Sequence, residues 1–255
     1  MQALADPDCG WFYRADAKSF DKIPGSPIAY WASQNEINVF KRGIPAHNIV
    51  DFAQGLKPGD TERFIRFWHE VSGGNVYKEK KVPTDSHYQS LTWFPISNGG
   101  DYRKWFGNIT DVVNWENQGH EIRTLRNDRG KFRARVQNEK YYFKEGLTWS
   151  ALTSGAISVR TNPVGTMCAG AGYFINAGKD GLFILGFLNS STCARLKKKI
   201  LNESMNNEVG NLSQLPVLKG LTGEVEHLVL LCTNICRTDW DSSEMSFSFE
   251  RHPFI

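Results

Sequence analysis

The sequence is poor in several features that would each assign it to a class at once. It has five cysteines in 255 residues, an odd and scattered set that argues against a secreted disulfide framework. Its longest apolar run, residues 182–188, is far shorter than the roughly 20 residues that a membrane span needs. The N-terminus has neither the basic start nor the apolar stretch of a signal peptide, and the net charge of +3 excludes a histone-like polycation. We therefore expect a soluble, cytoplasmic protein.

Catalytic motifs are also lacking. No Gly-x-Ser-x-Gly, Walker loop or His-Glu-x-x-His occurs. Asp60 with Glu79 and Lys81 is spaced like a nuclease metal site, but Asp60 stands at the start of a predicted helix, where capping is the simpler role. Cys232 and Cys236 lie one helical turn apart without a second ligand pair, which favours core thiols over a metal site. We expect no catalytic residue and no bound metal in this chain.

The composition otherwise fits a globular domain, with 40% apolar, 22% charged and 13% aromatic residues, including eight tryptophans. Residues 76–165 form short β-rich runs broken by turns, among them 147–151 and 156–160 around Ser154-Gly155. Helical spacing of apolar residues predicts helices before and after them. The fold class is therefore α+β: a β-rich domain with short irregular strands, flanked by helices including a long C-terminal helix. The predicted helices cover residues 60–71, 182–188, 192–201 and 217–235.

A basic segment spans residues 121–144, with eight basic and three acidic side chains. The alternation in 131–137 predicts a strand that turns Phe132, Ala134 and Val136 inward and its basic residues outward. Side chains on one face of a strand stand about 6.8 Å apart, close to the spacing of every second phosphate along DNA. A solvated strand face is the alternative, but the excess of arginine favours DNA contact. The outward basic residues are Lys131, Arg133 and Arg135.

A second segment, residues 98–119, interleaves aromatic, basic and amide side chains. Arginine and asparagine can contact phosphates or read base edges, and the candidates here are Arg103, Lys104, Asn108 and Asn114. The alternative is a β-meander that places Trp105 and Trp115 in the core. We favour the core for the tryptophans, whereas the pattern leaves the role of the polar residues open.

Seven segments, in this order, resemble the PglX family of adenine-specific DNA methyltransferases from BREX phage-defence systems, in the part after the methyltransferase domain. The resemblance implies a target recognition domain related to those of MmeI-type restriction-modification enzymes. It divides the chain into an extended lead-in (1–50), the target recognition domain (51–216) and a helix that leads to a further helical region (217–255). The apolar end at 251–255 suggests a fragment. The segments are residues 23–31 (IPGSPIAYW), 55–71 (GLKPGDTERFIRFWHEV), 103–108 (RKWFGN), 113–116 (VNWE), 142–149 (YFKEGLTW), 185–190 (LGFLNS) and 240–249 (WDSSEMSFSF).

The resemblance also implies a function. The family transfers a methyl group from S-adenosylmethionine to adenine N6 within a short DNA site. The target base leaves the helix for a pocket in the methyltransferase domain. The family's Asn-Pro-Pro-Tyr or Asn-Pro-Pro-Phe motif is absent here, since Asn162-Pro163 is followed by valine. We therefore expect this chain to recognise double-stranded DNA, to be inactive alone and to hold no cofactor. Implied partners are the methyltransferase domain, other BREX proteins and phage DNA-mimic inhibitors, and we expect a monomer.

On this interpretation the basic segment holds the DNA backbone, while the strand 148–150 and the turn 160–162 reach base edges. Pro58 and Thr61 depart from the family's Gly-x-x-Thr-Gly-x-Asn pattern, which puts a DNA role for these two positions in doubt. A different class stays open: an aromatic-rich β module that binds carbohydrate or protein through exposed tryptophans and is indifferent to salt. The candidate DNA-binding residues are Arg103, Lys104, Asn108, Asn114, Arg123, Arg129, Lys131, Arg133, Arg135, Lys144, Thr148, Ser150, Arg160, Thr161 and Asn162.

Overall fold

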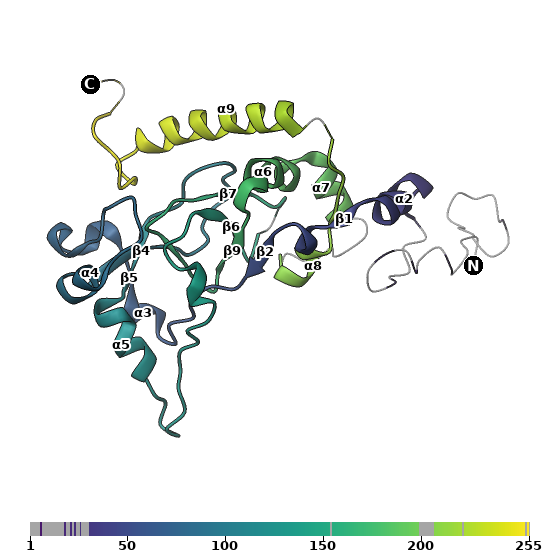
Figure 1. Ribbon diagram of the computed structural model, residues 1–255. Coiled ribbons are helices and arrows are strands. Elements are labelled where there is room, and N and C mark those ends of the chain that lie inside the picture. The colour runs from purple at the N-terminus through teal and green to yellow at the C-terminus, as the bar shows by residue number, and fades with distance from the viewer. Residues whose placement is uncertain are drawn as a thin grey trace.

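The computed structural model describes residues 31–153, 155–198, 207–220, 222–252 and 254, with five isolated positions before Trp31. Two four-stranded sheets lie at the centre and helices cover their flanks (Figure 1). This is the α+β class that the sequence predicts. Half of the predicted lead-in, the turn residue Ser154 and the end of the helix predicted over 192–201 lie outside the described residues.

The first sheet has the order β2-β9-β6-β7, and all of its neighbours run antiparallel. The strand predicted over 147–151 is confirmed as β6, which pairs with β7 through Thr148 opposite Arg160. The strand predicted over 156–160 starts only at Val159, and residues 160–162, expected as a turn, belong to β7 because they pair with β6. β6 is a central strand and is buried from Leu147 to Ser150. Strand bounds are β2 Asp51–Ala53, β6 Gly146–Ser150, β7 Val159–Asn162 and β9 Gly172–Asn176.

The second sheet has the order β3-β5-β4-β8, in which only the β4–β8 pair is parallel. Its core contains Phe94, Val113 and Trp115, and Trp149 of the first sheet is equally buried. The prediction that Trp115 belongs to the core is confirmed, with 2% of its surface exposed. Strand bounds are β3 Ile65–Phe67, β4 Trp93–Ser97, β5 Asp111–Asn114 and β8 Met167–Cys168, and the flanking helices are α4 Asp85–Ser90 and α5 Glu116–Thr124.

The first sheet shares its core with helices from both ends of the chain. Ile37 and Phe40 of α2 belong to the same cluster as Leu185 of α6, so α2 packs against the core of the first sheet. The helix predicted over 182–188 is confirmed as α6. The remaining elements are α2 Gln34–Arg42, β1 Ile44–Pro45 paired with β10 Pro216–Val217, α6 Gly181–Asn189, α7 Ser191–Leu196, α8 Val209–Ser213, and 3-10 turns at Ala46–Asn48, Trp68–Glu70, Gly73–Asn75, Glu139–Tyr141 and Gly178–Asp180.

The helix predicted over 60–71 is mostly wrong. Only α3, Thr61–Phe64, is helical, because Ile65 already pairs with Val113 of β5 and starts strand β3. Sheet pairing with a distant segment thus overrides the local helical spacing. The predicted capping role of Asp60 is confirmed, since its carboxylate accepts a hydrogen bond from the Arg63 backbone N–H at 3.2 Å.

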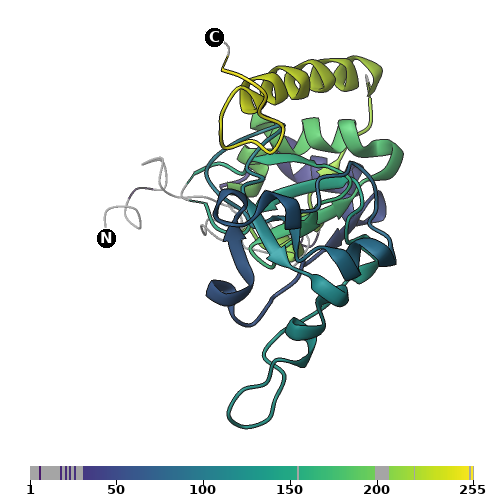
Figure 2. The ribbon, with the colours of Figure 1, turned by 90° about the vertical axis from the view of Figure 1, so that its left-hand side faces the viewer.

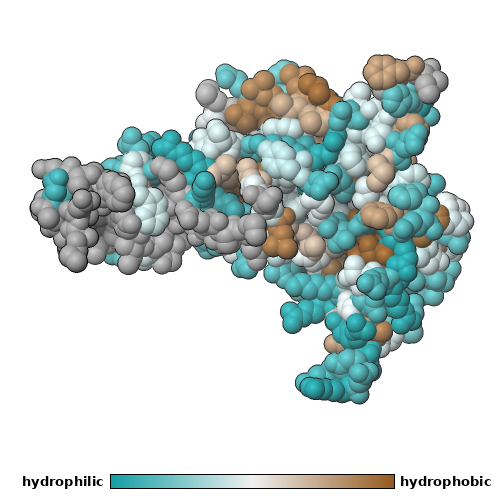
Figure 3. Space-filling model, turned by 180° about the vertical axis from the view of Figure 1, so that it is seen from behind, coloured by the Kyte–Doolittle hydropathy of each residue, from teal (hydrophilic) through white to brown (hydrophobic). Residues whose placement is uncertain are grey.

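The long C-terminal helix, α9, spans Thr222–Asp241, so it starts and ends later than the predicted range of 217–235. It packs on α6, where Gly186 allows close approach: a Cβ there would lie 2.7 Å from Val229. A second apolar stripe of α9 is exposed and forms the brown patch over α9 in Figure 3. It contains Leu228, Leu231 and Ile235, which are 61%, 46% and 68% exposed. Among the residues described, no helix combines the length and apolarity that a membrane crossing demands.

Candidate nucleic-acid interface

The most basic part of the surface is a projecting hairpin, residues 125–136, which we call the basic hairpin. It follows α5 and extends away from the body of the protein (Figures 1 and 2). Its two arms are joined by backbone hydrogen bonds from Arg133 N to Leu125 O at 3.0 Å and from Asn127 N to Lys131 O at 2.9 Å. Its outer part is therefore a two-stranded ribbon.

The tip of the basic hairpin has a defined turn. The side-chain oxygen of Asn127 accepts hydrogen bonds from the backbone N–H groups of Arg129 and Lys131, each at 3.0 Å. Gly130 adopts a φ of +71°, a conformation that glycine takes at little cost. An Asn side chain that closes its own turn limits the motion of the tip, so Arg129 and Lys131 are presented from an ordered loop.

The base of the basic hairpin is held by the segment before α3. Lys57 and Arg135 exchange two backbone hydrogen bonds, of 3.1 and 2.8 Å. Gly59 has a φ of +80° and lies so close to the hairpin that an added Cβ would stand 2.7 Å from the Arg133 carbonyl carbon. The Gln137 side chain donates to Gly55 O at 3.0 Å. These contacts fix the direction in which the hairpin leaves the body.

The strand predicted over 131–137 is only half right. Ala134 and Val136 do pack against the second core, but Phe132 is 59% exposed and the Arg126 guanidinium lies 3.9 Å from its ring centroid. The segment forms isolated bridges, at Phe132 and Arg135, rather than a sheet ladder. The alternation cannot bury Phe132 because the outer half of the hairpin extends beyond the core.

Five basic side chains of the hairpin are exposed, against one acidic residue, Asp128. Arg133 lies 3.5 Å from the Asp60 carboxylate, whereas Arg129, Lys131 and Arg135 form no ion pair with any residue that the structure describes. Unpaired cations on a projecting ribbon create a positive potential that favours a polyanion. The five are Arg126, Arg129, Lys131, Arg133 and Arg135, and the tip is hydrophilic (bottom of Figure 3).

Two other candidates of the basic segment lie beside the hairpin. Arg123 forms an ion pair with both carboxylate oxygens of Glu139 and stacks 5.2 Å from the Trp115 ring. Hydrogen bonding between the two side chains raises the pKa of Arg123 and lowers the pKa of Glu139. This pair closes the neck of the hairpin, and Arg123 is engaged within the protein. Lys144 is exposed.

The candidates in residues 98–119 are occupied by contacts within the fold. Arg103 pairs with Asp239 of α9 and donates through Nε to Phe106 O at 3.0 Å. Lys104 donates to Asn189 O at 2.7 Å. The side chains of Asn108 and Asn114 bond to backbone groups of Asp101 and Glu116. Arg103 and Lys104 fix the loop to α9 and α6, and the two asparagines hold local turns, so the four residues are not arranged as a free surface for phosphates.

The residues expected to reach base edges are buried or turned inward. Thr148, Arg160 and Asn162 are 0% exposed, and Ser150 is 8% exposed with its hydroxyl donating to Gly100 O. The Thr161 hydroxyl donates to Trp105 O at 3.3 Å. The structure therefore does not support base contacts by the 148–150 strand and the 160–162 turn, because β6 is a central strand and its partner β7 lies under α6.

Asn162 and Arg160 instead connect the two sheets. Asn162 accepts a hydrogen bond from Ser97 Oγ at 2.7 Å and donates to Thr166 O at 3.1 Å. The Arg160 guanidinium donates to Gly99 O, and burial lowers the pKa of Arg160 to about 10. Both side chains therefore serve the packing of β7 against the loop after β4.

Lys57 is the interface residue that the sequence interpretation missed. It is exposed and joined to the hairpin base. The neighbouring Pro58 is buried, and Thr61 opens α3. The run of Lys57, Pro58 and Gly59 indicates a turn, but nothing in it indicates that Lys57 pairs with the hairpin. The exposed basic set is then Lys57, the five hairpin residues and Lys144.

The tryptophans do not form a binding platform. Among those that the structure describes, Trp31 alone is exposed, at 44%, and Trp115 and Trp149 are fully packed in the two cores. A carbohydrate site needs accessible aromatic faces. The aromatic-rich binding module is therefore the weaker of the two interpretations.

Comparison with known proteins agrees with the resemblance seen in the sequence. The chain is 35% identical over 254 residues to the adenine-specific methyltransferase PglX of Lacticaseibacillus casei (strain Zhang), an alignment that covers 98% of this chain and 21% of that protein. It is 33% identical over 247 residues to the adenine-specific methyltransferase BrxX of Escherichia coli O9:H4 (strain HS), covering 92% of this chain and 18% of that protein. The chain thus spans about a fifth of the length of these curated relatives. No protein-family model matches it.

Proposed function

We propose that this chain is the DNA-recognition part of an adenine-specific DNA methyltransferase of the PglX type, and that the basic hairpin is its principal contact with the duplex. The observation that carries the proposal is a projecting ribbon with exposed, unpaired arginine and lysine side chains. Sequence identity along nearly the whole chain with two adenine-specific methyltransferases supports the choice of partner.

The shape of the hairpin suits a duplex. The major groove of B-form DNA admits a two-stranded β-ribbon, and the hairpin is such a ribbon with its narrow end outward. Arg129 and Lys131 at the tip are placed to enter a groove, whereas Lys57 and Arg135 at the base are placed to meet phosphates. Phosphate contacts set affinity and orientation, and a base contact by Arg129 is the route to sequence preference.

The chemistry of methylation lies outside these 255 residues in this proposal. The methyltransferase domain of the full-length protein supplies S-adenosylmethionine binding and the pocket for the flipped adenine, and this chain is inactive alone. The full-length protein acts in BREX phage defence in the cytoplasm, with double-stranded DNA, other BREX proteins and phage DNA-mimic inhibitors as partners. The chain itself is a monomer in this proposal.

The test is a salt titration of duplex binding, followed by the fluorescence anisotropy of a labelled duplex. The slope of log affinity against log salt falls by about 0.9 for every lost phosphate contact. The triple variant Arg129→Gln/Lys131→Gln/Arg135→Gln is expected to lower affinity at every salt concentration and to flatten the slope by about 2 to 3. A matched control, Lys41→Gln/Lys179→Gln/Lys198→Gln, removes the same charge from exposed positions outside the hairpin.

The control variant distinguishes DNA contacts made by the basic hairpin from attraction of DNA by the net positive charge of the chain. If both triple variants lose affinity equally, net charge and not the hairpin determines binding. If neither variant changes the slope, or if the wild-type chain shows no salt-dependent affinity for duplex DNA, the proposal is wrong.

A further inference from the structure

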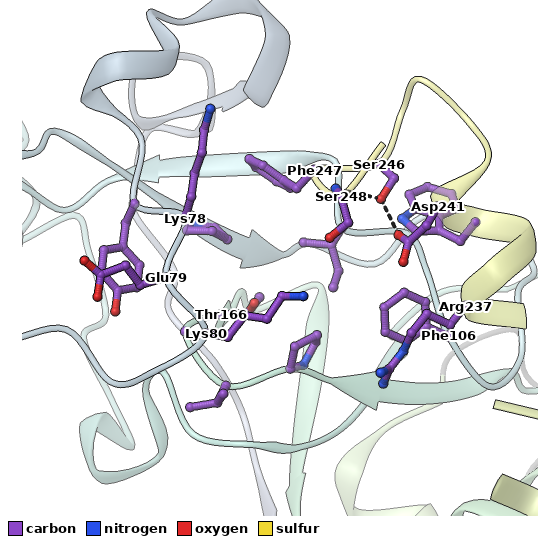
Figure 4. A pocket seen from close by; sticks show the side chains of 17 residues that line it. Lys78, Glu79, Lys80, Phe106, Thr166, Arg237, Asp241, Ser246, Phe247 and Ser248 are labelled. Carbon is purple, nitrogen blue, oxygen red and sulfur yellow. Dashed lines mark hydrogen bonds between the residues drawn. The ribbon is translucent and has the colours of Figure 1, made fainter. Parts of the chain in front are cut away.

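A cavity of about 180 Å³ lies between the second sheet and the C-terminal end of α9 (Figure 4). Three stretches of chain surround it: residues 77–80, residues 163–166, and the end of α9 with the turn 246–248 that folds back beneath it. The two ribbon views place α9 and the basic hairpin at opposite ends of the protein (Figures 1 and 2). The cavity is therefore separate from the proposed duplex contact.

The size and walls of the cavity suit one planar ring. A closed apolar cavity of about 150 Å³ holds one benzene molecule, so this cavity of about 180 Å³, which is open at its mouth, has room for one planar aromatic group somewhat larger than benzene. Its walls include Phe106, Trp240 and Phe247, with Pro95 and Val164. Aromatic walls favour a flat π-system, which they can contact by stacking or by edge-to-face packing.

The mouth of the cavity is positively charged. Lys80 and Arg237 line it, and neither forms an ion pair with a residue in the described part of the chain, whereas the ammonium of the third lining cation, Lys78, extends away from the cavity (Figure 4). The two carboxylates that line it are already engaged. Glu79 pairs with Lys81 at 2.5 Å and lies 3.1 Å from His87, while Asp241 accepts a hydrogen bond from Ser246 Oγ at 2.6 Å.

The charged side chains that line the cavity differ in the direction in which they point. In Figure 4 the Lys80 ammonium points from the side of Thr166 toward the space in front of Arg237 and Asp241, whereas Glu79 turns away from it. The Arg237 guanidinium lies 4.7 Å from the Phe106 ring centroid. Its N–H donors have no carboxylate partner among the described residues. An anionic group at the mouth would meet Lys80 and Arg237 together.

We propose that this cavity binds a single nucleotide, with the base inside and the phosphate at the mouth between Lys80 and Arg237. A base is a planar ring whose edge carries hydrogen-bonding atoms, and the Thr166 and Ser248 hydroxyls line the cavity beside the aromatic walls. A phosphate gains charge-assisted hydrogen bonds from Lys and Arg. The nucleotide is either free or an unpaired residue of a DNA strand, since both offer the same chemistry. The proposal does not depend on duplex binding by the hairpin.

The experiment measures binding of deoxyadenosine monophosphate to the 255-residue chain by calorimetry, with quenching of tryptophan fluorescence as a second signal. Deoxyadenosine and inorganic phosphate are the partial ligands. We expect the nucleotide to bind at least about tenfold more tightly than either part, because each part keeps only one set of contacts. Lys80→Met and Arg237→Met are each expected to weaken nucleotide binding by about tenfold, whereas Lys179→Met, at another exposed site, is expected to leave it unchanged.

Competition by DNA identifies the source of the nucleotide. Displacement by a single-stranded oligonucleotide, but not by a blunt duplex, supports an unpaired residue of a strand. Displacement by neither supports a free nucleotide. The proposal is overturned if the nucleotide does not bind, if deoxyadenosine binds as well as the nucleotide, or if Lys80→Met and Arg237→Met bind it like the wild type while their circular dichroism shows a folded chain.

Discussion

The basic hairpin and the β6–β7 pair are both segments where polar side chains in the sequence indicated DNA contact, yet the fold uses them in opposite ways. In the hairpin the basic side chains are exposed and mostly unpaired. In β6–β7 the corresponding polar residues Thr148, Arg160 and Asn162 are 0% exposed. The same kinds of residue therefore form a surface in one region and a buried network in the other.

The difference follows from what lies beside each segment. β6 is flanked by β9 and β7 within the first sheet, so its polar side chains are shut off from solvent. Ser150 donates to Gly100 O, whereas Thr148 Oγ1 has no hydrogen-bond partner among the described residues. The hairpin pairs with another segment only at its base, through Lys57 and Arg135, and from Phe132 to the tip it has only its own two arms. Arg160 lies on the edge strand β7, where α6 and the backbone bridge to Trp105 cover it. Coverage by neighbouring elements, rather than residue type, therefore decides whether an arginine is available to a ligand.

The largest expected effect lies in the buried region, with Asn162→Ala. The substitution removes the acceptor of Ser97 Oγ and the donor to Thr166 O, which leaves buried polar groups unpaired. We expect the free energy of unfolding to fall by about 3 kcal/mol, measured by urea denaturation. Asn234→Ala, at an exposed position of α9, serves as the control and is expected to change stability by less than about 0.5 kcal/mol. Equal stability of the two variants would contradict the buried network.

Gly59→Ala tests the junction between the hairpin and the body. The new methyl group would meet the backbone of Arg133 at 2.7 Å, at a φ of +80°. We expect a loss of about 2 kcal/mol in unfolding free energy, together with weaker duplex binding because the hairpin base is displaced. Gly74→Ala, where an added Cβ meets nothing within 4 Å, is the control. Normal duplex affinity in a destabilised Gly59→Ala variant would show that hairpin orientation is unimportant.

Arg129→Glu reverses a charge at the exposed tip. Since the side chain makes no ion pair within the described chain, we expect unfolding free energy to stay within about 0.5 kcal/mol of the wild type. Duplex affinity is expected to fall about tenfold, which corresponds to about 1.4 kcal/mol. The matched change Lys179→Glu, away from the hairpin, is the control. An equal loss of affinity in the control would remove the distinction between the tip and the rest of the surface.

The smallest effect concerns the neck of the hairpin and depends on pH. The pKa of Glu139 is lowered from an ordinary value of 4.5 by its hydrogen bond with Arg123. The ion pair therefore stabilises the fold above pH 4.5, and this contribution is lost as the pH falls through the lowered pKa. Because both side chains are more than a third exposed, the contribution is below about 1 kcal/mol.

In Glu139→Gln the free energy of unfolding is expected to lack the pH-dependent contribution of the ion pair. Urea denaturation between about pH 6 and pH 3 measures it. Glu244→Gln, at an exposed position, should follow the wild-type pH profile. If Glu139→Gln keeps the wild-type pH profile, the ion pair does not hold the neck of the hairpin in solution.

Much of the local structure could be predicted from the sequence. β6, β7 and α6 follow from alternation and from a compact apolar run, and the capping role of Asp60 follows from its place before a helix. The strand at Ile65 could not be predicted, because its partner Val113 is distant in the chain. The burial of Arg160 could not be predicted either, since a charged side chain gives no local sign of its interior position.

For the candidate site, the count of charges identified a basic segment that the structure shows to be exposed, but it did not indicate the shape of that segment. A basic alternating run predicts a strand in a sheet, whereas the structure has a ribbon that projects beyond the core. Lys57 lies beside the basic hairpin because its backbone pairs with Arg135. Contacts of this kind depend on the tertiary fold, and single-sequence patterns do not contain them.

Photo-crosslinking tests the central claim most directly. Phe132 of the hairpin and Tyr102 of the 98–119 segment are both aromatic and both 59% exposed, so benzoylphenylalanine can replace either one with equal access to solvent. The structure predicts that the probe at position 132 crosslinks to a bound duplex and that the probe at position 102 does not. Crosslinking at position 102 with none at position 132 would contradict the assignment of the basic hairpin as the DNA contact.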